Sequence, residues 1–199
     1  MQRSTAARNA AMDSFETLVG ASPIMRLLNT LPANCAAADS TVLAQGTLPA
    51  DWLANAASGA KAQSGVWSLT GQAAAGGGTV AAAYRIYDSG GTTCHEQGTV
   101  FEAVAIATSA STGANDNLLT FADTTGVVVG MKASGTGVVA GSKVLAVTGT
   151  TVKLSKASTA GVGSGVTITF GGDMTISDST VATGQNVVVS GSQYSAGNA

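Results

Sequence analysis

Charged residues are scarce in this sequence: Asp, Glu, Lys and Arg make up 10% of its 199 residues, against roughly 25% in an average soluble protein. So little charge favours two classes of protein, one that is largely covered in an assembly and one of an extracellular β type. The formal net charge of −2 offers no basic face to a nucleic-acid backbone, so we expect no nucleic-acid binding.

Long apolar runs are missing as well. No stretch of about 18 consecutive apolar residues occurs, so we expect no helix that spans a membrane. The residues before Asp13 also lack the continuous apolar segment of a secretory signal. We therefore predict a protein that is made in a cytoplasm and has no membrane partner.

Side chains used in catalysis and metal binding are few. The single histidine, His95, and the cysteines Cys35 and Cys94 lack the paired spacing of a zinc site. Adjacent strand residues point to opposite faces, so Cys94 and His95 cannot readily act as nucleophile and base. Asp88, next to Gly90-Gly91, fits a turn better than an acid catalyst. We predict no enzyme, no metal and no cofactor.

The sequence contains neither a calcium-binding loop nor a phosphate-binding loop, and it leaves the state of the two cysteines open. Asp173 and Asp178 belong to no dense carboxylate loop of the calcium-binding kind. Gly76-Gly77-Gly78 is not followed by the Lys-Ser/Thr of a phosphate loop. Cys35 and Cys94 could form one disulfide in an oxidising environment or remain two buried thiols.

Residues 84–101 combine aromatic residues, an arginine, a cysteine and the single histidine, and their pattern predicts a β-hairpin at the centre of the fold. Tyr84 and Ile86 alternate with Arg85 and Tyr87, so the two pairs lie on opposite faces of a strand. Residues 89–91, Ser-Gly-Gly, provide the positive φ angles of a tight turn.

An amphipathic helix is predicted from Ser4 or Thr5 to about Val19, with Gly20 as its stop signal. Its apolar stripe consists of Met12, Phe15, Leu18 and Val19, and Arg8, Asp13 and Glu16 are expected on the other side. Such a helix usually plugs one end of a β fold, and it can also serve as a docking helix for another subunit; the two roles do not exclude each other.

Short strands are predicted on both sides of the hairpin, at residues 23–28, 41–48, 66–69, 174–176 and 186–190, with a flexible loop at 71–78 and a last strand or frayed tail at 193–199. Four aromatic residues have two interpretations. Trp52, Trp67, Tyr84 and Tyr87 could line a sugar-binding aromatic surface, or fill a core that has few other large apolar residues.

Residues 103–170 differ in composition from the remainder. They contain no Cys, His, Trp, Tyr, Pro or Arg, and their four lysines against two aspartates give a formal charge of +2. Strands are predicted at 118–121, 127–133, 143–148, 151–154 and 166–170, with a hairpin turn at Gly149-Thr150. The expected fold is mainly β: a β-sandwich of residues 1–102 and 171–199 with a short N-terminal helix, and an inserted small all-β domain of residues 103–170.

Short motifs outside the insert form a distinctive set: Arg8-Asn9-Ala10, Leu31-Pro32-Ala33-Asn34-Cys35-Ala36-Ala37-Ala38-Asp39, Leu48-Pro49-Ala50-Asp51-Trp52, Arg85-Ile86-Tyr87-Asp88, Gly91-Thr92-Thr93-Cys94-His95, Gln97-Gly98-Thr99-Val100, Gly172-Asp173-Met174-Thr175 and Gly197-Asn198-Ala199. With them, residues 1–102 and 171–199 resemble a family of small virion proteins encoded by tailed bacteriophages. In that family Gln-Gly-Thr-Val leads within a few residues to Gly-Asp-Met-Thr, so residues 103–170 depart from the pattern.

The insert is itself similar to Gly/Thr/Val-rich modules of phage fibre and bacterial surface proteins, through residues 125–131, 134–137 and 147–152. The resemblance implies a structural component of a phage particle and transfers no catalytic residue. We therefore expect a capsid decoration or cement protein located in the virion. Its partners would be the major capsid protein or tail proteins and further copies of the chain. The alternative is a tail, baseplate or fibre component that binds host surface glycans or a receptor.

Overall fold

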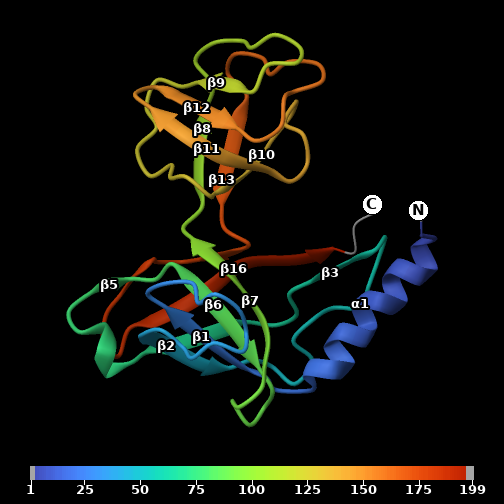
Figure 1. The fold of residues 1–199 in the computed structure, drawn as a ribbon, viewed down its shortest axis with the longest axis vertical. Helices are drawn as coiled ribbons and strands as arrows, with labels where there is room; N and C mark the ends of the chain where they lie inside the picture. Colours follow the sequence, from blue (N-terminus) through green and yellow to red (C-terminus); the bar gives the residue numbers. More distant parts are fainter. Residues whose placement is uncertain (1–2, 196–199) are drawn as a thin grey trace. The chain divides into compact units, whose positions relative to one another are not determined.

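The computed structural model describes residues 3–195 and is mainly β with one N-terminal helix (Figure 1). The chain divides into two compact units, one of Met1–Phe101 with Met174–Ala199 and one of Glu102–Asp173. We refer to them as the barrel unit and the inserted unit. The sequence placed the insert at residues 103–170. No helix among the described residues is long and apolar enough to cross a membrane.

The helix α1 spans Thr5–Val19, as predicted. Its N-terminus is capped by Ser4, whose hydroxyl accepts a hydrogen bond from the backbone N–H of Ala7 at 3.2 Å. The helix ends at Gly20, which has a φ of +85° that glycine tolerates best.

Seven strands of the barrel unit close into a barrel: β1 (Ile24–Leu28), β2 (Val42–Thr47), β4 (Trp67–Gly71), β6 (Ala83–Tyr87), β7 (Cys94–Phe101), β14 (Met174–Ile176) and β16 (Asn186–Ser195). Their order is β14-β7-β6-β1-β2-β4-β16, and β16 pairs with β14 to complete the ring. The short strand β3 (Ala60–Ala62) is attached to the far end of β16. A ribbon of β5 (Thr79–Val80) and β15 (Thr180–Val181) completes the unit, and the short helix η1 (Ala73–Ala75) occupies the predicted flexible loop.

The mainly β class is confirmed, but the expected sandwich is instead a closed barrel. Closure depends on β16, which pairs with β4 through Asn186–Val189 and with β14 through Val189–Ser192. It also depends on glycine where backbones approach closely. A Cβ atom on Gly46 would overlap the carbonyl of Ser68. Closure of the sheet into a barrel removes the free edges that two separate sheets would have.

The interior of the barrel unit is filled by the inward-facing residues of these strands and by side chains from their connections. Its largest fully buried apolar members are Trp52, Trp67, Met25, Leu27, Leu43, Leu53, Leu69 and Ile86. The predicted alternation of the hairpin is confirmed at Tyr84 and Ile86, which lie in this core.

The inserted unit is a six-stranded sheet in the order β8-β13-β10-β11-β12-β9. Its strands are β8 (Val104–Ala107), β9 (Leu118–Thr120), β10 (Lys132–Ser134), β11 (Ser142–Thr148), β12 (Thr151–Leu154) and β13 (Thr167–Gly171). A bridge between Thr108, which follows β8, and Phe121, which follows β9, links the two ends of this sheet. Phe121 and Phe170 pack edge to face in its core, with ring centroids 5.7 Å apart.

One strand prediction for the inserted unit was wrong and one strand was missed. The apolar run 127–133 is a strand only from Lys132 onward, because residues 127–131 form turns that bury Val127 and Met131. The strand at Val104–Ala107 was missed. At the C-terminus β16 continues to Ser195, and residues 196–199 of the predicted tail lie outside the described part of the chain.

Candidate functional site

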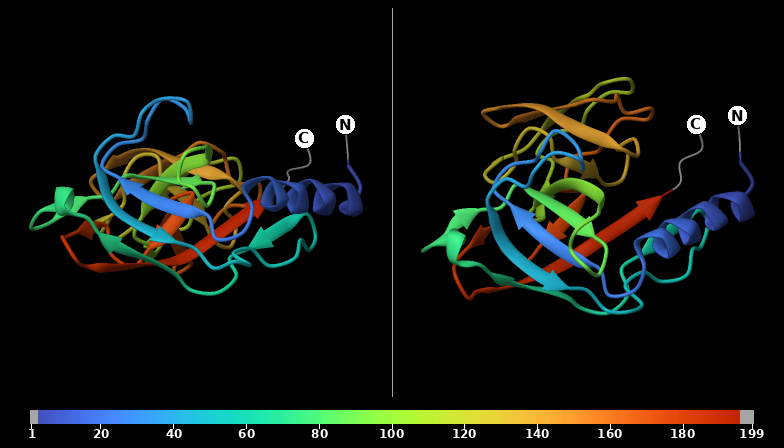
Figure 2. Two further views of the ribbon diagram at one scale, coloured as in Figure 1. Left: turned by 90° about the horizontal axis from the view of Figure 1, so that it is seen from below. Right: turned by 60° about the horizontal axis from the view of Figure 1, so that its bottom comes forward.

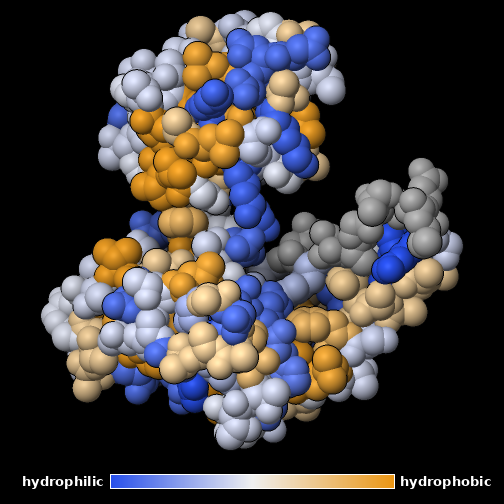
Figure 3. All heavy atoms as spheres, in the orientation of Figure 1, coloured by the Kyte–Doolittle hydropathy of each residue, from blue (hydrophilic) through white to orange (hydrophobic). Residues whose placement is uncertain are grey.

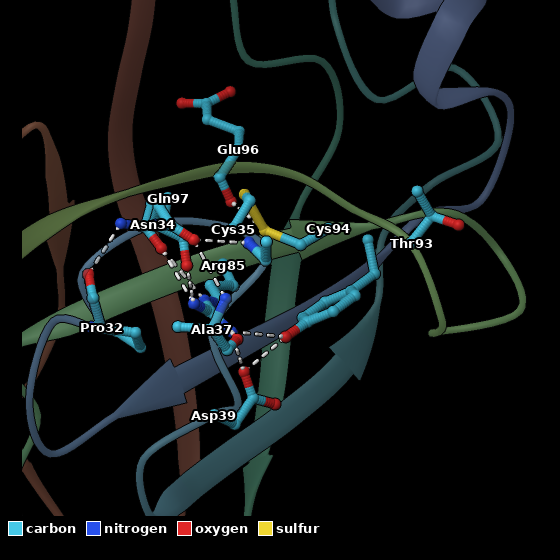
Figure 4. The surroundings of a disulfide bond; sticks show 12 residues. Pro32, Asn34, Cys35, Ala37, Asp39, Arg85, Thr93, Cys94, Glu96 and Gln97 are labelled. Carbon is cyan, nitrogen blue, oxygen red and sulfur yellow. Dashed lines mark hydrogen bonds and ion pairs between the residues drawn. A yellow bond between two sulfur atoms is a disulfide. The ribbon is translucent and has the colours of Figure 1, made fainter.

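The outer face of β6 carries a cluster of polar side chains centred on Arg85, which is only 1% exposed. Arg85 and Tyr87 point away from the barrel core because they alternate with Tyr84 and Ile86. The connection between β1 and β2, residues 29–41, crosses over them and covers the cluster (Figure 4).

Arg85 fastens this connection to the barrel. One terminal nitrogen donates to the carbonyl of Ala37 and to a carboxylate oxygen of Asp39, both at 2.8 Å. The other donates to the carbonyl of Asn34 and to the side-chain oxygen of Gln97 on β7. Since a guanidinium presents five N–H donors in a fixed plane, one side chain can hold several acceptors at once.

Asp39 is shared between two arginines and a tyrosine. It accepts hydrogen bonds from Arg85 at 2.8 Å, from Arg26 at 2.9 Å and from the hydroxyl of Tyr87. Burial alone would raise the pKa of Asp39, but the hydrogen bonds from Tyr87, Arg26 and Arg85 outweigh it and hold the pKa below its usual value. Arg26 also stacks on the Tyr87 ring, 4.4 Å from its centroid.

A disulfide between Cys35 and Cys94 ties the same connection to β7 (Figure 4). The two residues are 59 positions apart in the sequence, and their Cα atoms lie 5.3 Å apart. Of the two outcomes that the sequence left open, the structure has the disulfide. Residues 29–41 are therefore held by one covalent bond and by the charged cluster beneath them.

The polar side chains of this cluster hold the 29–41 connection in place. His95 lies beside it at the bulge of β7, between the pairs Ile86–Glu96 and Tyr87–Cys94. Arg85 and Arg26 donate to carbonyl, amide or carboxylate acceptors, and Tyr87 donates to Asp39. Among residues 3–195, no group of three His, Cys, Asp or Glu side chains lies close enough to hold a metal ion.

The other aspartates singled out in the sequence serve turns or ion pairs. Asp88 accepts hydrogen bonds from the backbone N–H of Thr92 at 2.8 Å and from that of Thr93, and the first of these chiefly lowers the pKa of Asp88 to about 2. Asp178 accepts from the N–H of Thr180. Asp173 pairs with Lys132 at 2.8 Å.

Trp52, Trp67, Tyr84 and Tyr87 are all buried, so of the two interpretations of these residues the sugar-binding surface is wrong. Trp52 and Trp67 are 0% exposed, Tyr84 is 3% and Tyr87 is 5% exposed. The indole N–H of Trp67 donates to the backbone carbonyl of Trp52 at 3.2 Å, which orients the Trp67 ring in the core. With few other large apolar residues available, Trp52, Trp67 and Tyr84 fill the core, whereas Tyr87 is buried on the outer face in the Arg85 cluster.

The expected docking helix presents no continuous apolar stripe to solvent. Val19 is buried in the core, Phe15 packs against it, Met12 is half-buried, and only Leu18 is largely exposed, at 68%. The stripe predicted for these four residues was wrong at Leu18, which points away from the barrel unit.

The polar side of α1 was also placed wrongly, because Asp13 and Glu16 face the barrel unit. Both form ion pairs with Lys61 of β3, Asp13 at 2.8 Å. Lys61 is 2% exposed, and the sequence analysis missed it. Its position as the single lysine outside residues 103–170 was the one signal that could have drawn attention to it. The two clusters are thus both devices that fasten a segment to the barrel.

Comparison with known proteins adds no relative to this picture: no protein-family model, no curated protein and no solved structure matches the chain significantly.

Proposed function

We propose that the chain is a non-enzymatic structural protein of a bacteriophage virion, a decoration or cement protein that docks on the capsid lattice. The observation that carries the proposal is the resemblance of residues 1–102 and 171–199 to small virion proteins of tailed phages. The fold supports it in one respect. Val100 and Met174 are paired neighbours, so the inserted unit leaves and re-enters the barrel unit at one place, as expected for a module added to an existing protein.

The polar clusters support a role without catalysis or cofactor. In the Arg85 cluster, the guanidinium, the Asp39 carboxylate and the Tyr87 hydroxyl are engaged with one another and with backbone carbonyls. A catalytic group instead needs a free position from which it can reach a substrate. Contacts of this chain with the major capsid protein would each be modest, and repetition on the lattice would supply avidity.

A binding experiment tests this proposal. The purified chain is incubated with phage particles that lack it, and the bound copies are counted by quantitative mass spectrometry. A decoration protein is expected to bind in proportion to the capsid subunits. Binding of only a few copies per particle, at one vertex, would instead indicate a tail component. No binding to particles of any related phage would remove the proposal.

The second candidate is a tail, baseplate or fibre component whose inserted unit contacts the host. Exposed apolar side chains of the inserted unit favour it, since Val129 is 61% and Leu145 53% exposed, and hydrophobic residues reach its surface in Figure 3. They favour a protein receptor over a glycan. The aromatic residues of residues 102–173, Phe121 and Phe170, are both buried, so this unit offers no aromatic platform for a sugar ring.

A further inference from the structure

The helix α1 is held to its own barrel unit by polar contacts that converge on one segment, residues 53–61. Asn9 accepts a hydrogen bond from the backbone N–H of Gly59 at 2.7 Å. Asp13 accepts from the N–H of Ala56 at 3.3 Å and from the ammonium of Lys61. Asn9, Asp13 and Glu16 are spaced at i, i+4 and i+7, so a single face of the helix makes these contacts.

Apolar anchoring is concentrated at the C-terminal half of α1. The ring of Phe15 lies 6.0 Å from that of Trp52 and 5.8 Å from that of Tyr194, and Val19 is 3% exposed. The N-terminal half relies on Asn9 and on Arg8, which lies over Gly59 so closely that a Cβ atom there would be 2.6 Å from the guanidinium. The helix follows β3 in the views of Figures 1 and 2.

Residues 53–61 form the site that binds α1, and Lys61 makes this site specific for the helix. Its side chain is 2% exposed, and its ion-pair partners Asp13 and Glu16 both belong to α1. A vacated site would expose Trp52 and leave this lysine without its carboxylates, so it would favour recapture of any α1 within reach. The helix of a second copy offers the same side chains at the same spacing.

The hinge that joins α1 to β1 is short and strained in the closed form. Ser22 has a φ of +52°, a conformation that residues other than Gly, Asn and Asp rarely adopt. It also precedes Pro23, and a residue before proline is driven toward an extended backbone. Both constraints on Ser22 are relieved if the hinge straightens, which would carry α1 away from its own barrel. Short hinges under strain favour the exchange of elements between copies.

We propose that α1 exchanges between copies of this chain, so that the helix of one copy binds the Lys61 site of another. All contacts of the closed form are kept in the exchanged form, while the strain at Ser22 is released. The inference names a second copy as the partner. It does not rest on a phage role, because it is tested on the purified chain and can fail or succeed whether or not the chain binds particles.

Charge reversal on the two sides of the interface gives the sharpest test. Lys61→Glu and the double variant Asp13→Lys/Glu16→Lys each place like charges together when the helix folds back on its own barrel. In a mixture, each helix finds opposite charges on the other variant. We expect native mass spectrometry to detect a one-to-one heterodimer that exceeds both homodimers by about tenfold. A mixture that remains monomeric would overturn the proposal.

A second test leaves the interface intact and acts on the hinge alone. Ser22→Gly removes the strain of the closed form and should lower the dimer fraction of the unmodified chain, whereas the β-branched residue in Ser22→Thr should raise it. Asn115→Thr is the matched control, since Asn115 has a φ of +62° but lies in the inserted unit.

Two outcomes of the hinge series count against exchange. Equal dimer fractions for the two Ser22 variants would show that the hinge does not control association. A dimer that persists after deletion of residues 1–20 would place the contact elsewhere on the chain.

Discussion

The barrel unit and the inserted unit are stabilised in different ways. The barrel unit buries two cations, Arg85 and Lys61, and uses each to fasten a segment that lies outside the barrel strands. In the inserted unit, as far as the structure describes it, the one ion pair joins Lys132 to Asp173, whose side chains are 45% and 30% exposed. Its stability therefore comes from a small apolar core and from its turns.

This difference predicts different sensitivities. Removing one partner of a buried, hydrogen-bonded charge is costly, whereas exposed pairs contribute little. Polar substitutions should thus damage the barrel unit far more than the inserted unit. Both tryptophans, Trp52 and Trp67, are buried in the barrel unit and residues 102–173 contain none, so tryptophan fluorescence reports on the barrel unit alone.

The largest effect is expected from Arg85→Met. The variant removes the Arg85 donor from the carbonyls of Asn34 and Ala37, of which Asn34 keeps the N–H of Ala37, and removes one of the two arginines of Asp39. Loss of one partner of a buried pair costs about 3–5 kcal/mol, and we expect the lower end because Arg26 still pairs with Asp39. Urea unfolding followed by tryptophan fluorescence measures the loss.

Two variants control this experiment. Lys132→Met breaks the exposed pair of the inserted unit and should leave the fluorescence transition unchanged, with at most about 1 kcal/mol lost elsewhere. Arg85→Met combined with Asp39→Leu should recover part of the loss, because the double variant also removes the carboxylate that loses an ion-pair partner in Arg85→Met. Equal losses for Arg85→Met and Lys132→Met would contradict the comparison.

A somewhat smaller effect is expected from removing the disulfide with Cys35→Ser and Cys94→Ser. A disulfide typically stabilises a fold by about 2–4 kcal/mol, mainly by restricting the unfolded chain. The loss should again appear in the fluorescence transition, since residues 35–94 belong to the barrel unit. If the double variant melts like the unmodified chain, the polar contacts of Arg85, Arg26 and Tyr87 suffice to hold the 29–41 connection.

A pH effect is expected at α1. A hydrogen bond from Lys61 lowers the pKa of Asp13 against the opposing effect of burial. Burial alone would lower the pKa of Lys61, but hydrogen bonds to Asp13 and Glu16 outweigh it and raise that pKa. The Asp13 carboxylate therefore stabilises the docking of α1 fully above its ordinary pKa of 3.8, and this stabilisation is lost as the pH falls through the lowered pKa. Lys61 stabilises docking fully below its ordinary pKa of 10.5, and this stabilisation is lost as the pH rises through the raised pKa.

Docking of α1 should thus be strongest between these limits and weaken at both extremes. Amide hydrogen exchange of residues 5–19 as a function of pH, corrected for intrinsic rates, measures the change in protection. Lys61→Met is the control: the helix loses protection at neutral pH and its acid dependence flattens. Protection that stays constant from neutral pH to pH 3 in the unmodified chain would show that apolar contacts of Phe15 and Val19 suffice.

Local patterns in the sequence predicted local structure well and long-range closure poorly. The alternation at residues 84–87, a cap at Ser4 or Thr5 and the stop at Gly20 depend on neighbouring residues and were predicted, and the structure has the cap at Ser4. The closed barrel depends on β16 pairing with two strands at once, a register that no short window contains.

The candidate site was less predictable for the same reason. The predicted hairpin placed Arg85 and Tyr87 on the face opposite the core, but their acceptors Asn34, Ala37 and Asp39 come from a connection about 50 residues earlier in the chain. Only folding brings them together. Lys61 was missed because an Ala-rich surrounding offers no periodic signal for a strand or for burial.

The smallest effect is expected from excising residues 103–170 and joining Glu102 to Gly171. The ends of the insert are paired neighbours, Val104 opposite Phe170, so the folded insert already spans its ends like a short loop. Closing a loop costs only about 0.6 kcal/mol per doubling of length, so the free energy of unfolding of the barrel unit should change by about 1 kcal/mol or less. A cooperative fluorescence melt close to that of the full chain is the expected result. Loss of cooperativity would mean that the barrel needs the insert to close, and the comparison between two separately stabilised units would then fail.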